Sequence, residues 1–166
     1  MSSVPTLFWD ASGLAKYYAE EIGNDTTETL FHQLPVPKML TTLWGYTETF
    51  SLLQRKRNDN RLSNKLFAEA VSRLRTDMID LPQFHLLTVT NTDLMGSVNF
   101  IQRHNINATD AALLATLLRY SRISSEACVL VAADKRMFRA ARAEGLPIVD
   151  PEAMPPGDVP AFLAAF

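Results

Sequence analysis

Short apolar runs alternate with helical patterns along most of the chain. The runs have the length of buried strands, and the intervening segments repeat apolar residues every three or four positions, as one face of a helix does. Strands are predicted at residues 6–9, 39–42, 84–89, 128–132 and 147–149. Helices are predicted at residues 10–22, 24–34, 43–57, 63–79, 92–104, 109–122 and 135–144.

This alternation of strands and helices predicts the fold class. Strands that are separated by a helix pair in parallel, so we expect an α/β fold with a short parallel sheet between layers of helices. The length of 166 residues is that of one domain. We assign residues 1–152 to this domain. The four prolines after residue 150 predict an irregular tail over residues 153–166, with an apolar turn near its end.

Composition excludes several classes of protein. Hydrophobic residues make up 47% of the chain and charged residues 20%, as in ordinary globular proteins. A formal net charge of −2 excludes a polycation that binds nucleic acid through bulk charge. Cys128 is the single cysteine, which excludes an intramolecular disulfide and a cysteine-built metal site. With no signal-peptide pattern and no apolar run of membrane-spanning length, we expect a cytoplasmic protein without membrane association.

The charge is distributed unevenly. Residues 55–75 contain seven basic and two acidic residues, and residues 103–142 contain seven basic and three acidic residues. Each stretch is explained either by a solvated helix face or by a local patch for a nucleic-acid backbone. The near-neutral total therefore leaves local binding of nucleic acid open.

Two aspartates stand where an α/β sheet binds its ligands. Asp10 directly follows the first predicted strand, and Asp134 lies just past the strand at residues 128–132. Ligands of such sheets bind beyond the carboxyl ends of the strands. Aspartate is also a favoured N-cap, which explains each residue taken alone. If the two strands are neighbours, both carboxylates lie on one edge of the sheet.

Asp110 and Glu48 are two further candidates, each with an alternative explanation. Asp110 is in phase with the leucine stripe of its helix, so its carboxylate points toward the core side. An acidic residue in that first turn also gains from the helix dipole. Glu48 lies on a narrow polar strip of an otherwise apolar helix, where periodicity does not separate a surface glutamate from a site glutamate.

The chemistry that such a set of carboxylates predicts is metal-dependent. Four carboxylates in one cavity repel each other, and a hard divalent cation such as Mg²⁺ or Mn²⁺ offsets that repulsion. One or two such ions polarise a phosphoryl oxygen and activate water. The sequence contains no recognisable Ser–His or Cys–His pairing, no histidines at metal-ligand spacing and no glycine-rich phosphate loop.

Four segments in order along the chain resemble the motifs of PIN-domain proteins, and most closely those of the VapC-like toxin branch. They are residues 8–18, 47–50, 108–115 and 132–138. The similarity covers residues 6–152. It implies a PIN-like three-layer α/β/α fold and a Mg²⁺- or Mn²⁺-dependent endoribonuclease, the toxin of a type II toxin–antitoxin pair.

The resemblance also implies roles for individual residues. By matched position, the acidic metal-site quartet consists of Asp10, Glu48, Asp110 and Asp134. Ser12 matches a hydroxyl residue that supports the first aspartate. Ala132 departs from the pattern, because threonine or serine is common there and would add a hydrogen-bond donor. We expect the RNA backbone to contact Arg55, Arg57, Arg61, Lys135 and Arg136. Trp44 or Tyr46 either stacks on a base or packs in the core.

The expected partners are an RNA substrate, a cognate antitoxin and a second copy of the chain. Two alternatives keep the same fold: a stand-alone RNA-processing nuclease and a non-catalytic PIN-like RNA-binding module. A haloacid-dehalogenase-type phosphatase also places an aspartate after its first strand. That enzyme needs a second aspartate two residues later, where this chain has Ser12.

Overall fold

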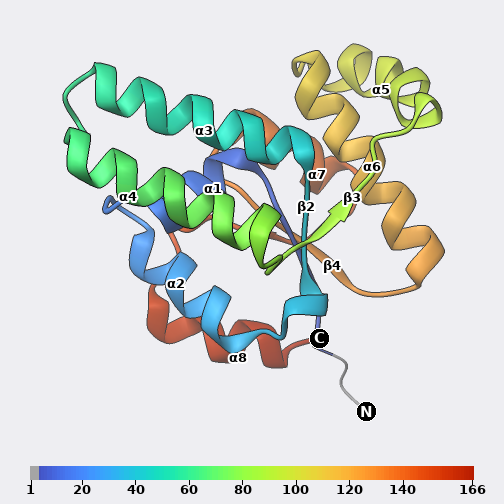
Figure 1. The fold of residues 1–166 in the computed structure, drawn as a ribbon. Helices are drawn as coiled ribbons and strands as arrows, with labels where there is room; N and C mark the ends of the chain where they lie inside the picture. The colour runs from blue at the N-terminus through green and yellow to red at the C-terminus, as the bar shows by residue number, and fades with distance from the viewer. Residues whose placement is uncertain (1–3) are drawn as a thin grey trace.

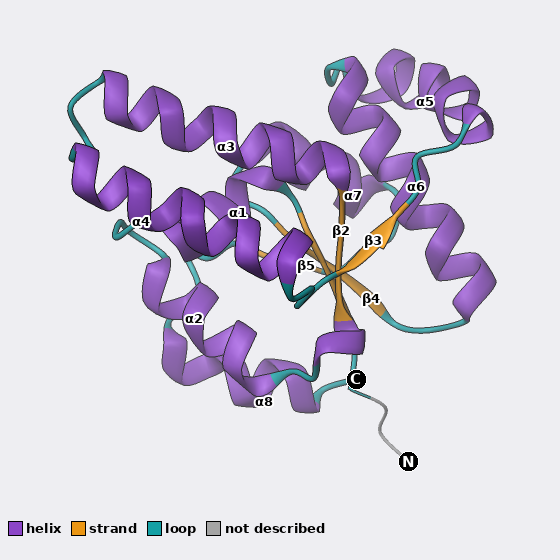
Figure 2. Ribbon diagram, in the orientation of Figure 1, coloured by secondary structure: helices purple, strands orange, loops and turns teal. Residues whose placement is uncertain are grey.

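A parallel sheet of five strands lies at the centre of the protein, with helices on both faces (Figures 1 and 2). The computed structural model describes residues 4–166, so the first three residues of the predicted domain lie outside the described residues. The strand order is β3-β2-β1-β4-β5. The strands are β1 (Thr6–Trp9), β2 (Met39–Thr42), β3 (His85–Leu87), β4 (Cys128–Val131) and β5 (Ile148–Val149). The predicted α/β class with a parallel sheet is confirmed.

Eight α-helices surround the sheet within the described residues. They are α1 (Ala11–Tyr18), α2 (Asn24–Gln33), α3 (Leu43–Asn58), α4 (Asn64–Arg75), α5 (Asn91–His104), α6 (Ala108–Ser124), α7 (Lys135–Ala143) and α8 (Val159–Ala164). Short 3₁₀ turns lie at Val36–Lys38 and Pro156–Asp158, and a π turn at Thr76–Asp80 extends α4. Over residues 4–166, none of the helices combines the length and the apolar character needed to cross a bilayer.

The core is divided by the sheet into two halves. On β1, Leu7 and Trp9 belong to the half covered by α1, α3 and α4, whereas Phe8 belongs to the half covered by α6 and α7. Every residue of β1, β2 and β4 is buried. Burial on both faces explains why these strands are nearly continuous apolar runs and do not alternate with polar residues.

Several element boundaries differ from the prediction. Helix α1 ends at Tyr18, four residues before the predicted end, and Gly23 precedes α2 in a left-handed conformation with φ of 92°. The side chain of Asn24 donates to the carbonyl oxygen of Lys16 at 2.8 Å. The side chain of Asn24 therefore satisfies a carbonyl group at the end of α1, and α2 begins without a side-chain cap.

The prediction of an irregular tail is wrong for residues 156–164. Pro156 and Pro160 fall in first turns, where a helix does not use the N–H that proline lacks. Val159 and Leu163 of α8 are buried, and the Thr26 hydroxyl on α2 donates to the Met154 carbonyl oxygen at 2.6 Å. This part of the tail therefore packs on α2 as part of the folded domain (Figure 1).

Gly13 and Gly96 differ in how closely another segment of the chain approaches them. A Cβ on Gly13 would lie 2.8 Å from the carbonyl oxygen of Val131, whereas a Cβ on Gly96 meets nothing within 4 Å. We expect Gly13→Ala to lower the free energy of unfolding by about 1–3 kcal/mol, because α1 must move away from β4. Gly96→Ala is the matched control and should raise it by about 0.5–1 kcal/mol. Urea unfolding measures both, and a Gly13→Ala protein as stable as the wild type would contradict the close approach.

Candidate active site

The four predicted carboxylates line one pocket at the carboxyl edge of the sheet. Parallel pairing places Trp9 of β1 beside Val131 of β4, so the chain leaves both strands at the same edge. The pocket beyond that edge has a volume of about 260 Å³. Its acidic lining residues are Asp10, Glu48, Asp110 and Asp134. We call this site the acidic pocket.

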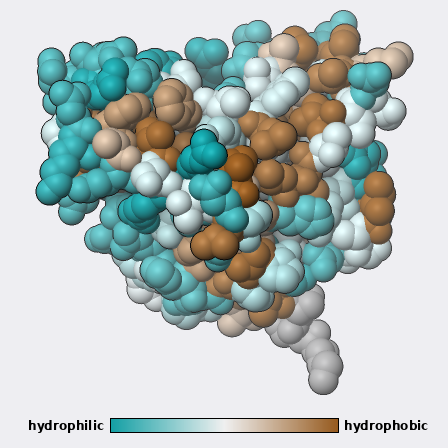
Figure 3. Space-filling view, viewed as in Figure 1, coloured by the Kyte–Doolittle hydropathy of each residue, from teal (hydrophilic) through white to brown (hydrophobic). Residues whose placement is uncertain are grey.

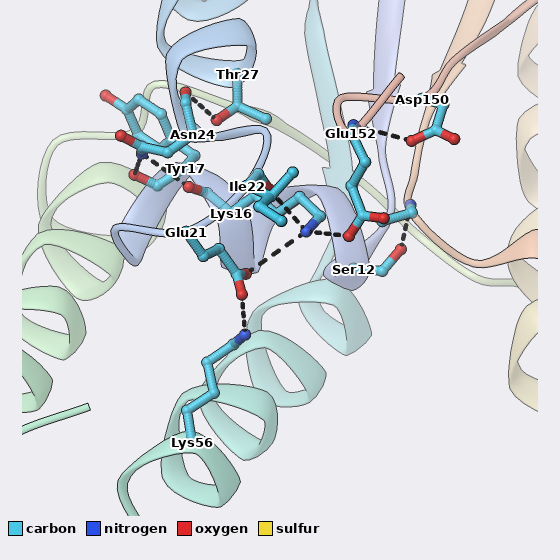
Figure 4. Close-up of polar contacts among 11 residues, drawn as sticks. Ser12, Lys16, Tyr17, Glu21, Ile22, Asn24, Thr27, Lys56, Asp150 and Glu152 are labelled. Carbon is cyan, nitrogen blue, oxygen red and sulfur yellow. Dashed lines mark hydrogen bonds and ion pairs between the residues drawn. The ribbon is translucent and has the colours of Figure 1, made fainter. Parts of the chain in front are cut away.

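Asp10 is held by hydrogen bonds to β4 and to the first turn of α1. Its backbone N–H donates to the Val131 carbonyl oxygen at 3.0 Å. Its carboxylate accepts from the N–H of Ser12 at 3.1 Å and from the Ser12 hydroxyl at 2.5 Å. The same hydroxyl oxygen accepts from the Ala133 N–H at 2.8 Å (Figure 4 shows this bond at Ser12). Ser12 therefore supports Asp10 and also joins α1 to the segment after β4.

Burial raises the pKa of Asp10, the hydrogen bonds from Ser12 lower it, and the charge of Asp134 raises it further, with a net upward shift. Ala132, where a hydroxyl residue was expected, is buried and donates its N–H to the Val149 carbonyl oxygen at 3.2 Å. The support of Asp10 thus comes from Ser12.

Asp110 is oriented by Asn107, a residue that sequence reasoning missed. Asn107 is the N-cap of α6: its Oδ1 accepts from the Asp110 N–H at 2.8 Å, and its Nδ2 donates to Asp110 Oδ2 at 2.8 Å. An asparagine three residues before an acidic residue at a helix start is the signal that would have identified it. Burial, followed by the charges of Asp10 and Asp134, raises the pKa of Asp110 to about 6.

Glu48 lies on the side of α3 that faces the acidic pocket. It therefore lines the pocket, and the interpretation as an ordinary surface glutamate is not needed. Burial and the charges of Asp10 and Asp110 raise the pKa of Glu48 to about 7, and the nearby Arg55 guanidinium acts in the opposite direction. Glu48 therefore interacts electrostatically with the other carboxylates, although it comes from a different layer of the fold.

Asp134 combines the two roles that its position suggested. It is the N-cap of α7, and its Oδ1 accepts from the N–H groups of Arg136 at 2.7 Å and Met137 at 3.1 Å. It also lines the acidic pocket. Capping and membership of the site are therefore compatible, because both capping bonds use the same oxygen.

The donor chemistry of the acidic pocket fits a hard divalent cation. Carboxylate oxygens are the preferred ligands of Mg²⁺ and Mn²⁺. Burial and then the charges of neighbouring carboxylates raise the pKa of Glu48 and of Asp110, and a cation would oppose both effects. As they stand, no three histidine, cysteine, aspartate or glutamate side chains in residues 4–166 are close enough to hold one ion.

Two of the five predicted RNA-binding residues lie at the acidic pocket. Arg55 lines it, and the Arg136 charge lowers the pKa of Asp110. Arg57 instead stacks over the Phe67 ring at 4.5 Å, and Arg61 pairs with Asp59 at 2.8 Å. Lys135 is exposed in the first turn of α7.

The two aromatic candidates differ in their surroundings. Tyr46 packs against the core cluster beneath α3, whereas Trp44 is 38% exposed and lines a separate groove with Leu86 and Leu87. Neither side chain lines the acidic pocket.

An ion-pair network around the buried Lys16 was not foreseen (Figure 4). Lys16 of α1 is 5% exposed, and its Nζ lies 2.6 Å from Glu152 Oε1 and donates to the Ile22 carbonyl oxygen at 2.9 Å. Glu21 lies 3.8 Å from Lys16 and 2.5 Å from Lys56 of α3. The network therefore connects α1, which carries Ser12, with the segment after β5 and with the helix of Glu48.

Comparison with known proteins identifies the fold and not the family. No family model matches this chain, and no curated protein matches it. A chain of a solved structure described as a toxin-antitoxin complex from Klebsiella pneumoniae is similar in fold, with a TM-score of 0.56. The two are 16% identical, and the similarity covers 88% of this chain and 98% of that chain. The α/β arrangement of a sheet between helices is thus shared over nearly the whole of that protein.

The raised pKa of Glu48 predicts a pH-dependent stability. Between its ordinary value of 4.5 and about 7, folded Glu48 holds a proton that the unfolded chain releases, so the stability of the metal-free protein falls as pH rises through this range. We expect Glu48→Gln to raise the free energy of unfolding at pH 8 by roughly 1–2 kcal/mol, after allowance for solvent screening.

Thermal unfolding from pH 5 to 8.5 in a chelator, followed by circular dichroism, measures this effect. Glu20→Gln removes an exposed glutamate outside the acidic pocket and should leave the pH profile unchanged. A Glu48→Gln protein with the wild-type profile would show that Glu48 does not carry the raised pKa.

Proposed function

We propose that the protein is a metal-dependent endoribonuclease that hydrolyses RNA phosphodiester bonds, and that it acts as the toxin of a type II toxin–antitoxin pair. The observation that carries the proposal is the acidic pocket, where carboxylates from four separate segments meet at one sheet edge. The motif resemblance supports ribonuclease chemistry. The fold similarity to a chain of a toxin-antitoxin complex supports the toxin role.

Each pocket residue has a part in this proposal. Asp10 and Asp110 would hold the principal metal ion, with Glu48 and Asp134 completing the acidic set. A bound Mg²⁺ or Mn²⁺ ion supplies Lewis-acid polarisation of a phosphoryl oxygen and lowers the pKa of water. Ser12 keeps the Asp10 carboxylate in place, and Asn107 does the same for Asp110.

The basic residues at the rim would bind the substrate. The guanidinium groups of Arg55 and Arg136 lie close to carboxylates of the acidic pocket. Arginine binds phosphate oxygens through paired hydrogen bonds, so these side chains would hold the RNA backbone against the negative pocket.

A non-catalytic RNA-binding module is the second candidate. It is favoured by the finding that, over residues 4–166, no three potential ligand side chains stand close enough for one ion. In that case the basic rim would bind RNA, and the carboxylates would perform no hydrolysis. Metal-stimulated cleavage separates the two candidates.

The proposed role implies protein partners, an antitoxin and a second copy of the chain. Figure 3 shows apolar surface gathered around the exposed edge of the sheet near β3. Leu43 and Trp44 at the start of α3 are 54% and 38% exposed, and Met95 and Val98 of α5 are 78% and 59% exposed. Apolar side chains concentrated in this way are typical of surfaces that a partner protein covers.

The main test is cleavage of RNA by the purified protein. With Mg²⁺ or Mn²⁺ we expect fragments of total RNA with defined ends, none in excess chelator, and a rate at least about 100-fold lower for Asp10→Asn. Asp158→Asn alters an exposed aspartate far along the chain from the motifs and should cleave like the wild type. Cleavage that persists in chelator or in Asp10→Asn refutes the metal mechanism. RNA binding without cleavage supports the binding module.

The toxin role has its own test in living cells. We expect induced expression to reduce colony counts of a bacterial host at least about 100-fold, because RNA hydrolysis stops growth. Asp110→Asn should restore the counts at equal protein levels, whereas Asp158→Asn should not. Normal growth with a wild-type protein that cleaves RNA in vitro would favour a stand-alone RNA-processing nuclease.

A further inference from the structure

A second cavity lies between α5 and α6, which form the pair of helices at the upper right of Figure 1. Its volume is about 370 Å³, and it shares no lining residue with the acidic pocket. Arg103 of α5 and Arg119 and Arg122 of α6 all line it, and Asp93 is the one carboxylate in its lining. We call it the arginine cavity.

Asp93 neutralises Arg119, and its carboxylate already accepts from four donors. Its carboxylate accepts from Arg119 Nε at 2.8 Å and Nη2 at 2.9 Å, and from the N–H and hydroxyl of Thr90 at 2.8 and 2.9 Å. Burial acts to raise the pKa of Asp93, but these hydrogen bonds hold it below its ordinary value. The Asp93–Arg119 pair therefore lines the cavity without adding net charge to it.

Arg103 and Arg122 keep donors for a ligand. Arg103 is 55% exposed, and its Nη1 lies 3.0 Å from Glu144 Oε1, an oxygen that it shares with His104 at 2.7 Å. Its guanidinium stacks over the Phe100 ring at 5.1 Å, which orients it. Arg122 has no carboxylate within 4 Å in the described part of the chain. The cavity thus has an excess of positive charge.

Gly96 gives an independent indication that the cavity is kept open. It lies in the interior of α5, where glycine weakens a helix relative to alanine. Packing does not require it, because an added Cβ meets no atom within 4 Å, and Gly96 is not among the glycines with positive φ. What the missing side chain provides is open space along the α5 wall of the cavity.

We propose that the arginine cavity binds a phosphate group of single-stranded RNA. The substrate is then held both at the acidic pocket and at the arginine cavity. The choice of RNA among phosphate-bearing ligands rests on the proposed function. Arginine forks match phosphate oxygens, and excess positive charge selects a polyanion.

Helix α6 sets the spacing between the acidic pocket and the arginine cavity. Asp110 lines the acidic pocket, and Arg122 lies twelve residues further along the helix, about 18 Å at 1.5 Å per residue. A stacked strand that rises about 3.4 Å per nucleotide covers this distance in about five nucleotides. The protein should therefore bind RNA of more than five nucleotides more tightly than a trinucleotide.

Fluorescence anisotropy with a labelled 12-nucleotide RNA and a labelled trinucleotide, in chelator so that nothing is cleaved, tests this proposal. We expect Arg122→Gln to weaken binding of the 12-nucleotide RNA about 5–10-fold and to reduce the slope of log affinity against log salt by about 0.7, as for one lost phosphate contact. Trinucleotide binding should not change. Arg75→Gln removes one exposed arginine of α4 outside the cavity and should change neither quantity.

Gly96→Gln separates a binding defect from a folding defect. Glutamine is a better helix former than glycine and fills the open space, so this variant should have an unchanged or higher Tm and weaker binding of the 12-nucleotide RNA. Wild-type affinity and salt slope in both Arg122→Gln and Gly96→Gln overturn the proposal. Inorganic phosphate serves as a competitor in the same assay. If phosphate displaces the 12-nucleotide RNA and the trinucleotide equally well, the cavity holds a small anion and the proposal is overturned.

The outcome is independent of the nuclease assay. A protein that binds RNA through Arg122 but does not cleave it with metal contradicts the proposed function and leaves the arginine cavity in place. A protein that cleaves RNA, while the cavity variants bind RNA like the wild type, contradicts only the present inference.

Discussion

The parallel pairing of β1 with β4 is the interaction on which the acidic pocket depends. It brings Asp10 and Asp134 to one edge, and three local features secure it there: the Asp10 N–H bond to Val131, the Ser12 bridge to Ala133, and the close approach that Gly13 permits. Glu48 and Asp110 then reach the same edge from helices on opposite faces of the sheet. A shift of one strand would separate the set, because each carboxylate is positioned from a different segment.

The acidic pocket opposes the stability of the protein that contains it. Partly buried carboxylates that raise each other's pKa store unfavourable electrostatic energy, which the folded chain must offset elsewhere. The two buried halves of the core and the Lys16 network around α1 supply stabilising interactions close to the pocket. In the proposed function a bound cation would relieve the same repulsion, so the feature that weakens the metal-free protein would also favour metal binding.

The sequence predicted those parts of the molecule that follow from local pattern. Buried strands, long periodic helices and the aspartates at strand ends were all foreseen, because periodicity and position relative to a strand are local properties. Pairs formed by residues far apart in the sequence were not: Lys16 meets Glu152, and nothing near either residue indicates the other. Helix α8 was missed because six residues with a proline carry no periodic signal. The pocket side of Glu48 and the separate locations of Arg57 and Arg61 likewise depend on packing between helices.

The position of β4 late in the chain affects when the pocket forms during synthesis. A growing chain exposes Asp10 and Glu48 early, but Ala133, which fixes Ser12, and both remaining carboxylates leave the ribosome only afterwards. Translation proceeds from the N-terminus, and β1 has no β4 to pair with until that point. The complete pocket therefore exists only after β4 and Asp134 have been synthesised.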